Sequence, residues 1–503
     1  MAIVSTYKGG QDLSDATIIR DAMRALPSLA IASTGQPPLL EEIFFPESHA
    51  EVLDPEVSLV IGNRGMGKTF WSLALADKSL RPEIAARFLN TRPLKFDNFD
   101  VVLGFADAEG AKGLVSRANL ESVARKIPPE IIWRTVLLRH LAPLVGEHIP
   151  GNFRDAVTWV RSHPDQQLEI LKRVDEHLVT SGRRILFIFD QLDQLATGWE
   201  RIQELTQGLL KTALAMKSYR TIKTKLFMRP DQAENKVLFR FPDASKILGG
   251  SRILNWRMTD LYGLLFFEIL RIPNARPAFD AICKSAGIDS RAIHPRLLIP
   301  EALAGNFESQ SEAFDEIAGS LMGRGTKRGR PYTWIATHLA DGRGEISPRT
   351  FLKVMKTAAE WNSPPPESTA IDFNGIQEGV RQASGTRLAE LEEDYPWVST
   401  ALEPLRGLLV PCLPDEIAVR WKKAETSKEI TSNFSGASAP IDLVVAHMIG
   451  DNDSATMLIK LLSEIGVVEE RDNGKINVPD IFRVKAGILR KGGVTPQQRR
   501  RLR

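Results

Sequence analysis

The 503-residue chain is too long for a single compact core, so we expect about three domains. Its composition, 43% hydrophobic and 25% charged with a formal net charge of +3, is ordinary for a soluble protein and indicates no one class of partner. No apolar stretch is long enough to span a membrane, the first residues lack a signal-peptide pattern, and Cys283 and Cys412 cannot by themselves form a disulfide framework or a zinc site. These features exclude the membrane-spanning and disulfide-rich secreted classes, and we expect a cytoplasmic protein.

A glycine-rich motif follows an N-terminal helical segment that we expect over residues 1–55. Residues 57–61 are an apolar run that predicts a strand, and residues 70–76 predict a helix. Between them the sequence matches the P-loop pattern G-x-x-x-x-G-K-[ST], which requires this strand–loop–helix setting. The motif consists of Gly62, Asn63, Arg64, Gly65, Met66, Gly67, Lys68 and Thr69.

This P-loop predicts nucleotide binding. The glycines let successive backbone N–H groups, backed by a helix N-terminus, face the phosphates. Lys68 would reach the β- and γ-phosphates, and the Thr69 hydroxyl would hold Mg²⁺. We therefore expect ATP and Mg²⁺ as cofactors.

Strands and helices alternate after the P-loop. We expect strands at residues 99–105, 184–189, 224–229 and 251–256, and helices at residues 114–126, 129–145, 153–180 and 198–219. Such alternation implies a parallel sheet with helical crossovers. The strand at 184–189 is a fully apolar run that ends in Asp190.

The rest of the chain is expected to be mainly helical. A helix begins near residue 259, and helices continue to about residue 361, before the proline-rich linker at 363–367. Near the C-terminus, two short helices precede an Asn473-Gly474 hairpin signal, which is the layout of a winged helix. The expected domains are an N-terminal helical segment at 1–55, an ATPase core at 56–257, a helical lid at 258–362, a linker with connector helices at 363–438, and a winged helix with a basic tail at 439–503.

The second half of the nucleotide site resembles that of AAA+ and STAND ATPases, within the ASCE branch of P-loop NTPases. An apolar strand ending in Asp190 resembles a Walker B strand, whose carboxylate holds Mg²⁺. The resemblance implies an α/β P-loop NTPase fold, a parallel sheet flanked by helices, with one strand between the P-loop and Walker B strands. It also assigns Arg229 to sensor 1, Arg349 on the lid to sensor 2, and Arg240 to an arginine finger that acts on a neighbouring subunit.

One position departs from the AAA+ pattern. The residue after the Walker B Asp is Gln191, where these ATPases usually carry a glutamate that orients the attacking water. Asp193, three residues after Asp190, is the available substitute, and this D-x-x-D pattern resembles that of STAND-like ATPases. Either Asp193 takes that role, which we favour, or hydrolysis is slow and the site acts as a switch.

Three phrases, at residues 241–246, 346–351 and 478–483, resemble a group of uncharacterised bacterial P-loop ATPases that often lie among mobile or antiviral-defence genes. This second resemblance bears on the setting, whereas the function that the AAA+/STAND-like core, the lid and the winged helix predict is a cytoplasmic Mg-ATP-dependent molecular switch that controls its C-terminal domain. One alternative is a weakly hydrolysing scaffold that recruits a separate effector, and another is a DNA-dependent motor or loader.

The C-terminal segment leaves its partner open between protein and double-stranded DNA. The expected recognition helix offers only Lys460 as a basic group, and one basic side chain is too few for specific contacts with bases in a groove. A wing and a basic tail could instead grip phosphates without reading sequence. The candidate DNA-binding residues are Lys460, Lys475, Arg499, Arg500, Arg501 and Arg503. The other partners expected are a second copy of the chain in a homo-oligomer and an effector protein encoded nearby. We do not expect the protein to bind a membrane.

Overall fold

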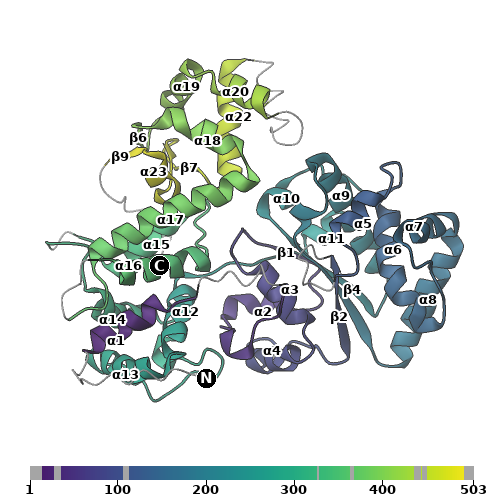
Figure 1. Ribbon diagram of the computed structural model, residues 1–503, viewed down its shortest axis with the longest axis horizontal. Coiled ribbons are helices and arrows are strands. Elements are labelled where there is room, and N and C mark those ends of the chain that lie inside the picture. The colour runs from purple at the N-terminus through teal and green to yellow at the C-terminus, as the bar shows by residue number, and fades with distance from the viewer. Residues whose placement is uncertain are drawn as a thin grey trace, which may run out of the picture.

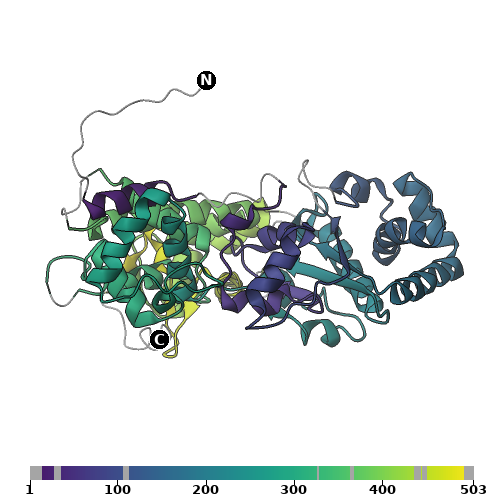
Figure 2. The same ribbon diagram turned by 90° about the horizontal axis from the view of Figure 1, so that it is seen from below.

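The structure is a computed structural model. It describes residues 14–27, 35–105, 113–325, 328–362, 368–434, 443 and 450–491. Figures 1 and 2 show two parts, one holding the sheet with its helices and the other holding the remaining helices with the C-terminal strands.

A five-stranded parallel sheet forms the centre of the first part (Figure 1). Its strands are β1 (Leu59–Ile61), β2 (Phe99–Phe105), β3 (Arg184–Phe189), β4 (Ile222–Met228) and β5 (Arg252–Ile253). They lie in the order β2-β3-β4-β1-β5, so β4 separates the P-loop strand β1 from the Walker B strand β3. The predicted α/β P-loop NTPase fold and its intervening strand are therefore confirmed.

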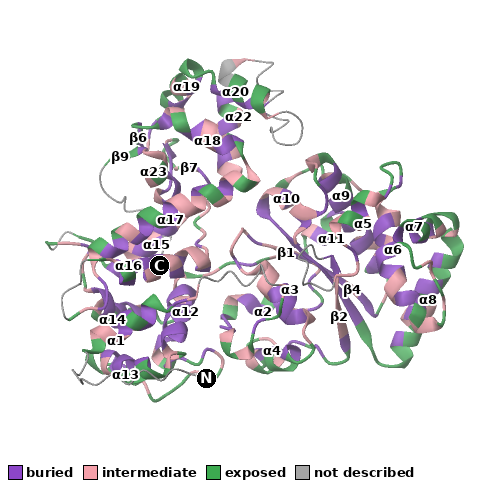
Figure 3. Ribbon diagram, in the orientation of Figure 1, coloured by how far each residue is buried: buried purple, intermediate pink, exposed green. Residues whose placement is uncertain are grey.

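Helices cover both faces of this sheet, as the apolar strands require. Along β3, Ile185, Phe187 and Phe189 pack into one hydrophobic core, while Leu186 and Ile188 pack into the other. The first face is covered by α6 (Pro129–Leu141) and α9 (Trp199–Met216), and the second by α3 (Lys68–Ala76) and α4 (Leu80–Phe88). Figure 3 shows β1 and β4 buried between these layers.

Smaller helices complete the core. The prediction of a single helix at 153–180 is wrong, because this segment forms two helices, α7 (Phe153–Ser162) and α8 (Pro164–Thr180). The break falls before Pro164, which has no backbone N–H to continue the hydrogen bonds of α7. The helix expected at 114–126 is shorter, α5 (Arg117–Ser122). The remaining helices of this part are α2 (Ala50–Leu53), α10 (Pro230–Glu234) and α11 (Ser245–Leu248).

The second part begins with a helical layer. It contains α12 (Met258–Leu270), α13 (Arg276–Ser285), α14 (Phe307–Ala318), α15 (Pro331–Leu339) and α16 (Pro348–Glu360). The N-terminal helix α1 (Asp15–Arg24) packs on α13 and α16 rather than on the core (Figure 1). Arg20 fixes it there, because its Nε donates to the Ala359 carbonyl at 2.8 Å.

A long helix, α17 (Phe373–Asp394), joins this layer to the C-terminal unit (Figure 1). It packs closely along α16, since a Cβ at Gly379 would lie 2.7 Å from the Val354 carbonyl. In its described part, the C-terminal unit also contains α18 (Trp397–Leu402), β6 (Leu409–Val410), α19 (Pro414–Lys423), α20 (Thr426–Asn433), α22 (Asp451–Glu464), β7 (Glu469–Glu470), β8 (Ile476–Asn477), α23 (Asp480–Ala486) and β9 (Leu489–Arg490).

The predicted hairpin is confirmed, because β7 and β8 pair antiparallel around Asn473-Gly474. Helices α19 and α20, which fall within the expected connector segment, pack against α22. Within the described ranges, no helix is both long and apolar enough to cross a membrane. Cys283 and Cys412 are both buried free thiols.

Candidate nucleotide-binding site

The P-loop connects β1 to α3 and opens onto a cavity of about 680 Å³. Gly65 and Gly67 have φ angles of +82° and +102°, a region that side chains disfavour, so the motif needs glycine at both positions. Gly67 directly precedes Lys68, the first residue of α3, so the N-terminus of a helix faces the cavity. A loop of this shape is suited to binding an anion.

The cavity gathers most of the residues that the sequence predicts for the nucleotide site. Its charged and polar lining includes Arg64, Lys68, Thr69, Asp190, Gln191, Asp193, Arg229 and Arg349. Phe44, Trp256 and Leu264 provide apolar wall as well. Polar groups converging beside an apolar wall are typical of a site for a small molecule with charged and aromatic parts.

Lys68 is folded back onto the loop. Its Nζ donates to the carbonyl oxygens of Gly62, at 2.6 Å, and Asn63, at 3.0 Å. Burial lowers the pKa of Lys68, and the nearby Asp190 carboxylate opposes that change. An ammonium held by two carbonyls and one neighbouring carboxylate is available to a phosphate that enters the cavity.

Asp190 lies at the end of β3, 5% exposed, and its carboxylate oxygens make no hydrogen bond of good geometry with the described protein, although the Thr69 hydroxyl and the Gln191 backbone lie close. Burial raises its pKa, whereas the Thr69 hydroxyl and the Lys68 ammonium lower it. Burying a charged carboxylate without a hydrogen-bonded partner has a large desolvation free energy, and a bound cation would offset it. Asp190 and Thr69 supply the oxygen ligands that Mg²⁺ prefers, so the residues present fit this ion. Among the described residues no cluster of three or more His, Cys, Asp or Glu side chains could hold a metal alone.

Gln191 and Asp193 both line the cavity beyond Asp190. Gln191 has a φ of +56°, so the backbone turns sharply straight after the strand. This turn brings Asp193 to Arg229, whose Nη1 lies 3.3 Å from the Asp193 Oδ2. Asp193 keeps 27% of its side chain exposed, which leaves it access to solvent in the cavity.

Arg229 follows β4 and is the most heavily engaged cation of the site. It contacts Asp231 and Asp394 at 3.1 and 3.0 Å, and donates to the Tyr395 hydroxyl at 2.5 Å. Burial alone would lower its pKa, but Asp231, Tyr395 and Asp394 raise it, so it remains charged. Arg229 therefore connects the core to the end of α17.

Arg349, near the start of α16, lines the same cavity. Its Nη1 lies 3.3 Å from Glu390, while its Nε is buried without a hydrogen bond in the described structure. The adjacent Ser347 donates to the Gly65 carbonyl at 3.3 Å, so α16 rests directly on the P-loop.

Arg240, Lys460 and Lys475 are not among the residues that line this cavity. Arg240 is exposed on the segment between α10 and α11. Lys460 on α22 is exposed and lies 3.8 Å from Glu464, and Lys475 is partly exposed beside the hairpin turn. Arg499, Arg500, Arg501 and Arg503 lie outside the described residues.

Sequence reasoning missed the contribution of α17. The arginines of the site are contacted by residues far from them in sequence. These are Glu390, Glu393 and Asp394 in the last five positions of α17, and Tyr395 directly after it. A signal was present, because a run of acidic residues at the C-terminal end of a helix opposes the helix dipole. Such a run indicates cations nearby.

No protein-family model and no curated protein matches the chain. Among solved structures it is similar to the ORC2 protein of Aeropyrum pernix in ADPNP-ADP complexes, with 12% identity, a TM-score of 0.37, and coverage of 93% of this chain and 91% of that one. It is also similar to Cdc6p from Pyrobaculum aerophilum (12% identity, TM-score 0.25, 89% and 88% covered) and to the A. pernix ORC1 protein in complex with DNA (13%, 0.31, 93% and 96%). Since these TM-scores are low, we base the fold on the sheet order and the P-loop.

Proposed function

We propose that the protein is a molecular switch that binds and hydrolyses Mg-ATP in the P-loop cavity. The observation that carries this proposal is the meeting of Lys68, Thr69 and the unbonded Asp190 carboxylate in one cavity. Those three groups are the ones that a P-loop NTPase uses for the β- and γ-phosphates and for their metal ion.

Residues of the P-loop and of the ends of β3 and β4 would each have a separate role in binding and hydrolysis. The loop N–H groups and Lys68 would bind the phosphates, and Thr69 and Asp190 would hold Mg²⁺. The bound ion would neutralise charge on the β- and γ-phosphate oxygens. Asp193 would accept a hydrogen bond from the attacking water, and Arg229, 3.3 Å away, would fix the orientation of that carboxylate.

The lid would report the state of the nucleotide. Arg349 lines the cavity from α16, and the Ser347 hydroxyl donates to the Gly65 carbonyl. A conformational change of the P-loop would therefore be transmitted to the lid through direct contacts. Helix α17 packs on α16 and α23, which gives that change a route to the C-terminal unit. Arg240, exposed on the core, is available to a neighbouring copy in an oligomer.

The role of the C-terminal unit is a further part of this proposal. We favour a protein partner over base-specific DNA contact, because the described part of α22 presents Lys460 beside its own Glu464. Bacterial origin, kinship with STAND ATPases and a setting in antiviral defence are proposals that stem from the resemblance of the sequence phrases alone.

Calorimetric titration with Mg-ATP tests the proposal. Lys68→Ala should abolish measurable binding without lowering the melting temperature, whereas the matched control Lys78→Ala, at an exposed position just after α3, should bind like the parent. Equal binding by the Lys68→Ala protein would overturn the proposed site. Binding without any phosphate release by the parent would favour the scaffold over the ATPase.

A further inference from the structure

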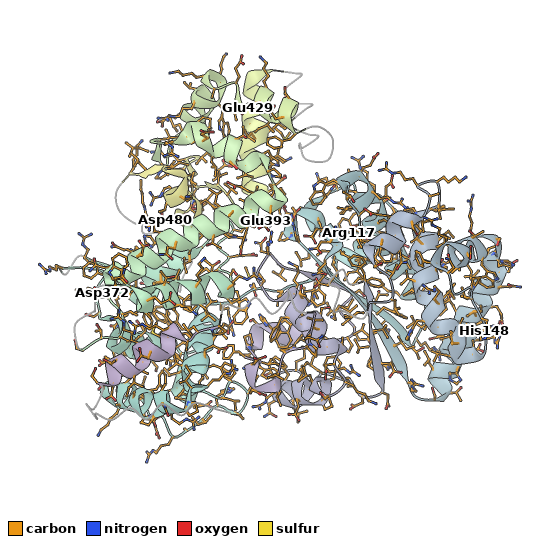
Figure 4. The ribbon with its side chains drawn as sticks, in the orientation of Figure 1. Arg117, His148, Asp372, Glu393, Glu429 and Asp480 are labelled. Atoms are coloured by element: carbon orange, nitrogen blue, oxygen red, sulfur yellow. The ribbon has the colours of Figure 1, made fainter. Side chains whose placement is uncertain are left out.

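Helix α17 ends in an unusually acidic turn. Glu390, Glu392, Glu393 and Asp394 occupy four of its last five positions, and no basic residue lies in its last turn. The C-terminus of a helix carries partial negative charge, so acidic residues there are unfavourable unless cations compensate. Figure 4 shows Glu393 at the end of α17 that lies toward the core.

The cations that contact this turn are Arg387 of α17 itself, 3.4 Å from Glu390, and three arginines from three other elements. Arg64 of the P-loop contacts Glu393 at 2.5 Å and Asp394 at 3.4 Å. Arg229 contacts Asp394 at 3.0 Å, and Arg349 contacts Glu390 at 3.3 Å. All three arginines line the nucleotide cavity, and so do Glu393 and Asp394.

Asp394 is the centre of this arrangement. Its carboxylate bridges Arg64 and Arg229, and its side chain is 17% exposed. Burial raises its pKa, the two arginines lower it, and the neighbouring Asp193 and Asp231 raise it again. The site is therefore already crowded with negative charge before any nucleotide enters.

A guanidinium binds carboxylate and phosphate through the same in-plane N–H groups, so one edge of an arginine cannot bind both at once. A γ-phosphate would add negative charge beside Asp193, Asp231 and Asp394, where each added anion repels the carboxylates already present. The phosphate and the end of α17 therefore compete for the same cations.

We propose that Glu390, Glu393 and Asp394 of α17 form a carboxylate latch that closes onto Arg64, Arg229 and Arg349 and is displaced by the terminal phosphate of the nucleotide. This inference rests on the proposed function and adds the group that opposes the nucleotide. Helix α17 packs closely on α16, since a Cβ at Gly375 would lie 2.7 Å from the Ala358 carbonyl, and it also packs on α23. Release of the latch would thus move the lid and the C-terminal unit together.

Nucleotide affinity measured on neutralised variants tests the latch. The variants are Asp394→Asn alone and the triple variant Glu390→Gln, Glu393→Gln, Asp394→Asn. The matched control is Glu392→Gln, in the same turn, because no described contact ties that side chain to the three arginines. Each protein is titrated with ADP and with a non-hydrolysable ATP analogue, both with Mg²⁺, after its melting temperature has been compared with that of the parent.

The triple variant should bind the ATP analogue about 5- to 50-fold more tightly than the parent, which is a typical coupling between two sites. Asp394→Asn should give a smaller gain in the same direction. ADP, which lacks the γ-phosphate, should gain little, and Glu392→Gln should match the parent for both nucleotides. A triple variant that binds the analogue no more tightly than Glu392→Gln overturns the latch while leaving ATP binding intact. If none of the proteins binds either nucleotide, the proposed function itself fails, and the latch fails with it.

A distance measurement adds a readout that affinity does not give. Spin labels at Lys78→Cys in the core and Glu429→Cys in α20 occupy exposed positions in the two parts, and both native cysteines are buried. The analogue should shift the distance distribution of the parent. The triple variant should show the shifted distribution without nucleotide, and an unshifted distribution in that variant would contradict the latch.

Discussion

Replacing Arg229 with methionine should destabilise the protein strongly, because the arginine neutralises three carboxylates in a mostly enclosed site. Its side chain is 8% exposed, and those of Asp394, Asp231 and Asp193 are 17%, 23% and 27% exposed. Removing one partner of a buried ion pair costs about 3–5 kcal/mol. Since the carboxylates keep some solvent, we expect about 3 kcal/mol, the lower end of that range.

Differential scanning calorimetry gives the magnitude. For a unit the size of the ATPase core, about 3 kcal/mol corresponds to a fall in melting temperature of roughly 6–12 °C. The matched control is Arg240→Met, which removes the same charge at an exposed position and should change stability by less than about 0.5 kcal/mol.

The loss should depend on pH, with a definite sign. In the parent, Arg229 holds the pKa of Asp231 below its ordinary value despite burial, so Asp231 contributes stability that is lost as pH falls through its folded-state pKa. Without Arg229, burial and the like-charged neighbours raise the pKa values of Asp231 and Asp394 in the folded state. The folded variant then binds more protons than its unfolded chain, so its stability rises as pH falls. The difference between parent and variant should shrink between about pH 8 and about pH 5. A constant difference across that range, or a loss no larger than that of Arg240→Met, would refute the ion-pair reasoning.

Three further outcomes follow from the site. Asp193→Asn should keep nucleotide bound but lower phosphate release by about 10²- to 10⁴-fold, with Gln191→Ala mild, and the reverse ranking would show that the group that orients water is misplaced. If Arg240 acts on a neighbouring copy, mixing Arg240→Ala with Lys68→Ala protein should restore phosphate release that neither shows alone, and no restoration would exclude that role. Any affinity for labelled duplex DNA should fall by orders of magnitude as the salt concentration rises. The dependence of log affinity on log salt concentration should become less steep when the four tail arginines are replaced with alanine. If the parent does not bind DNA even at low salt, the partner of the C-terminal unit is a protein. Those arginines are Arg499, Arg500, Arg501 and Arg503.

Local motifs made the phosphate end of the site predictable. The P-loop pattern needs glycine where φ is positive, and the structure has φ of +82° and +102° at Gly65 and Gly67. Asp190 was found because a buried parallel strand is a continuous apolar run whose end is easily seen. Both signals lie within a few residues of sequence.

Contacts between distant segments were not predictable in this way. Asp394 and Tyr395 reach Arg229 across more than a hundred positions, and nothing near Arg229 in sequence specifies them. The docking of α1 on α13 and α16 likewise depends on Arg20 reaching carbonyl oxygens at the end of α16. Only packing of the whole chain decides such partners, although the acidic end of α17 was a visible sign that cations lie near it.

The most direct test of the central claim is electron paramagnetic resonance with Mn²⁺ in place of Mg²⁺. We expect the parent to immobilise Mn²⁺ only when ATP is present, because Thr69 and Asp190 supply too few ligands to hold the ion without the phosphates. Asp190→Asn should weaken that signal strongly while the protein stays folded. Immobilised Mn²⁺ without nucleotide, or an unchanged signal in the Asp190→Asn protein, would contradict the proposed Mg-ATP site.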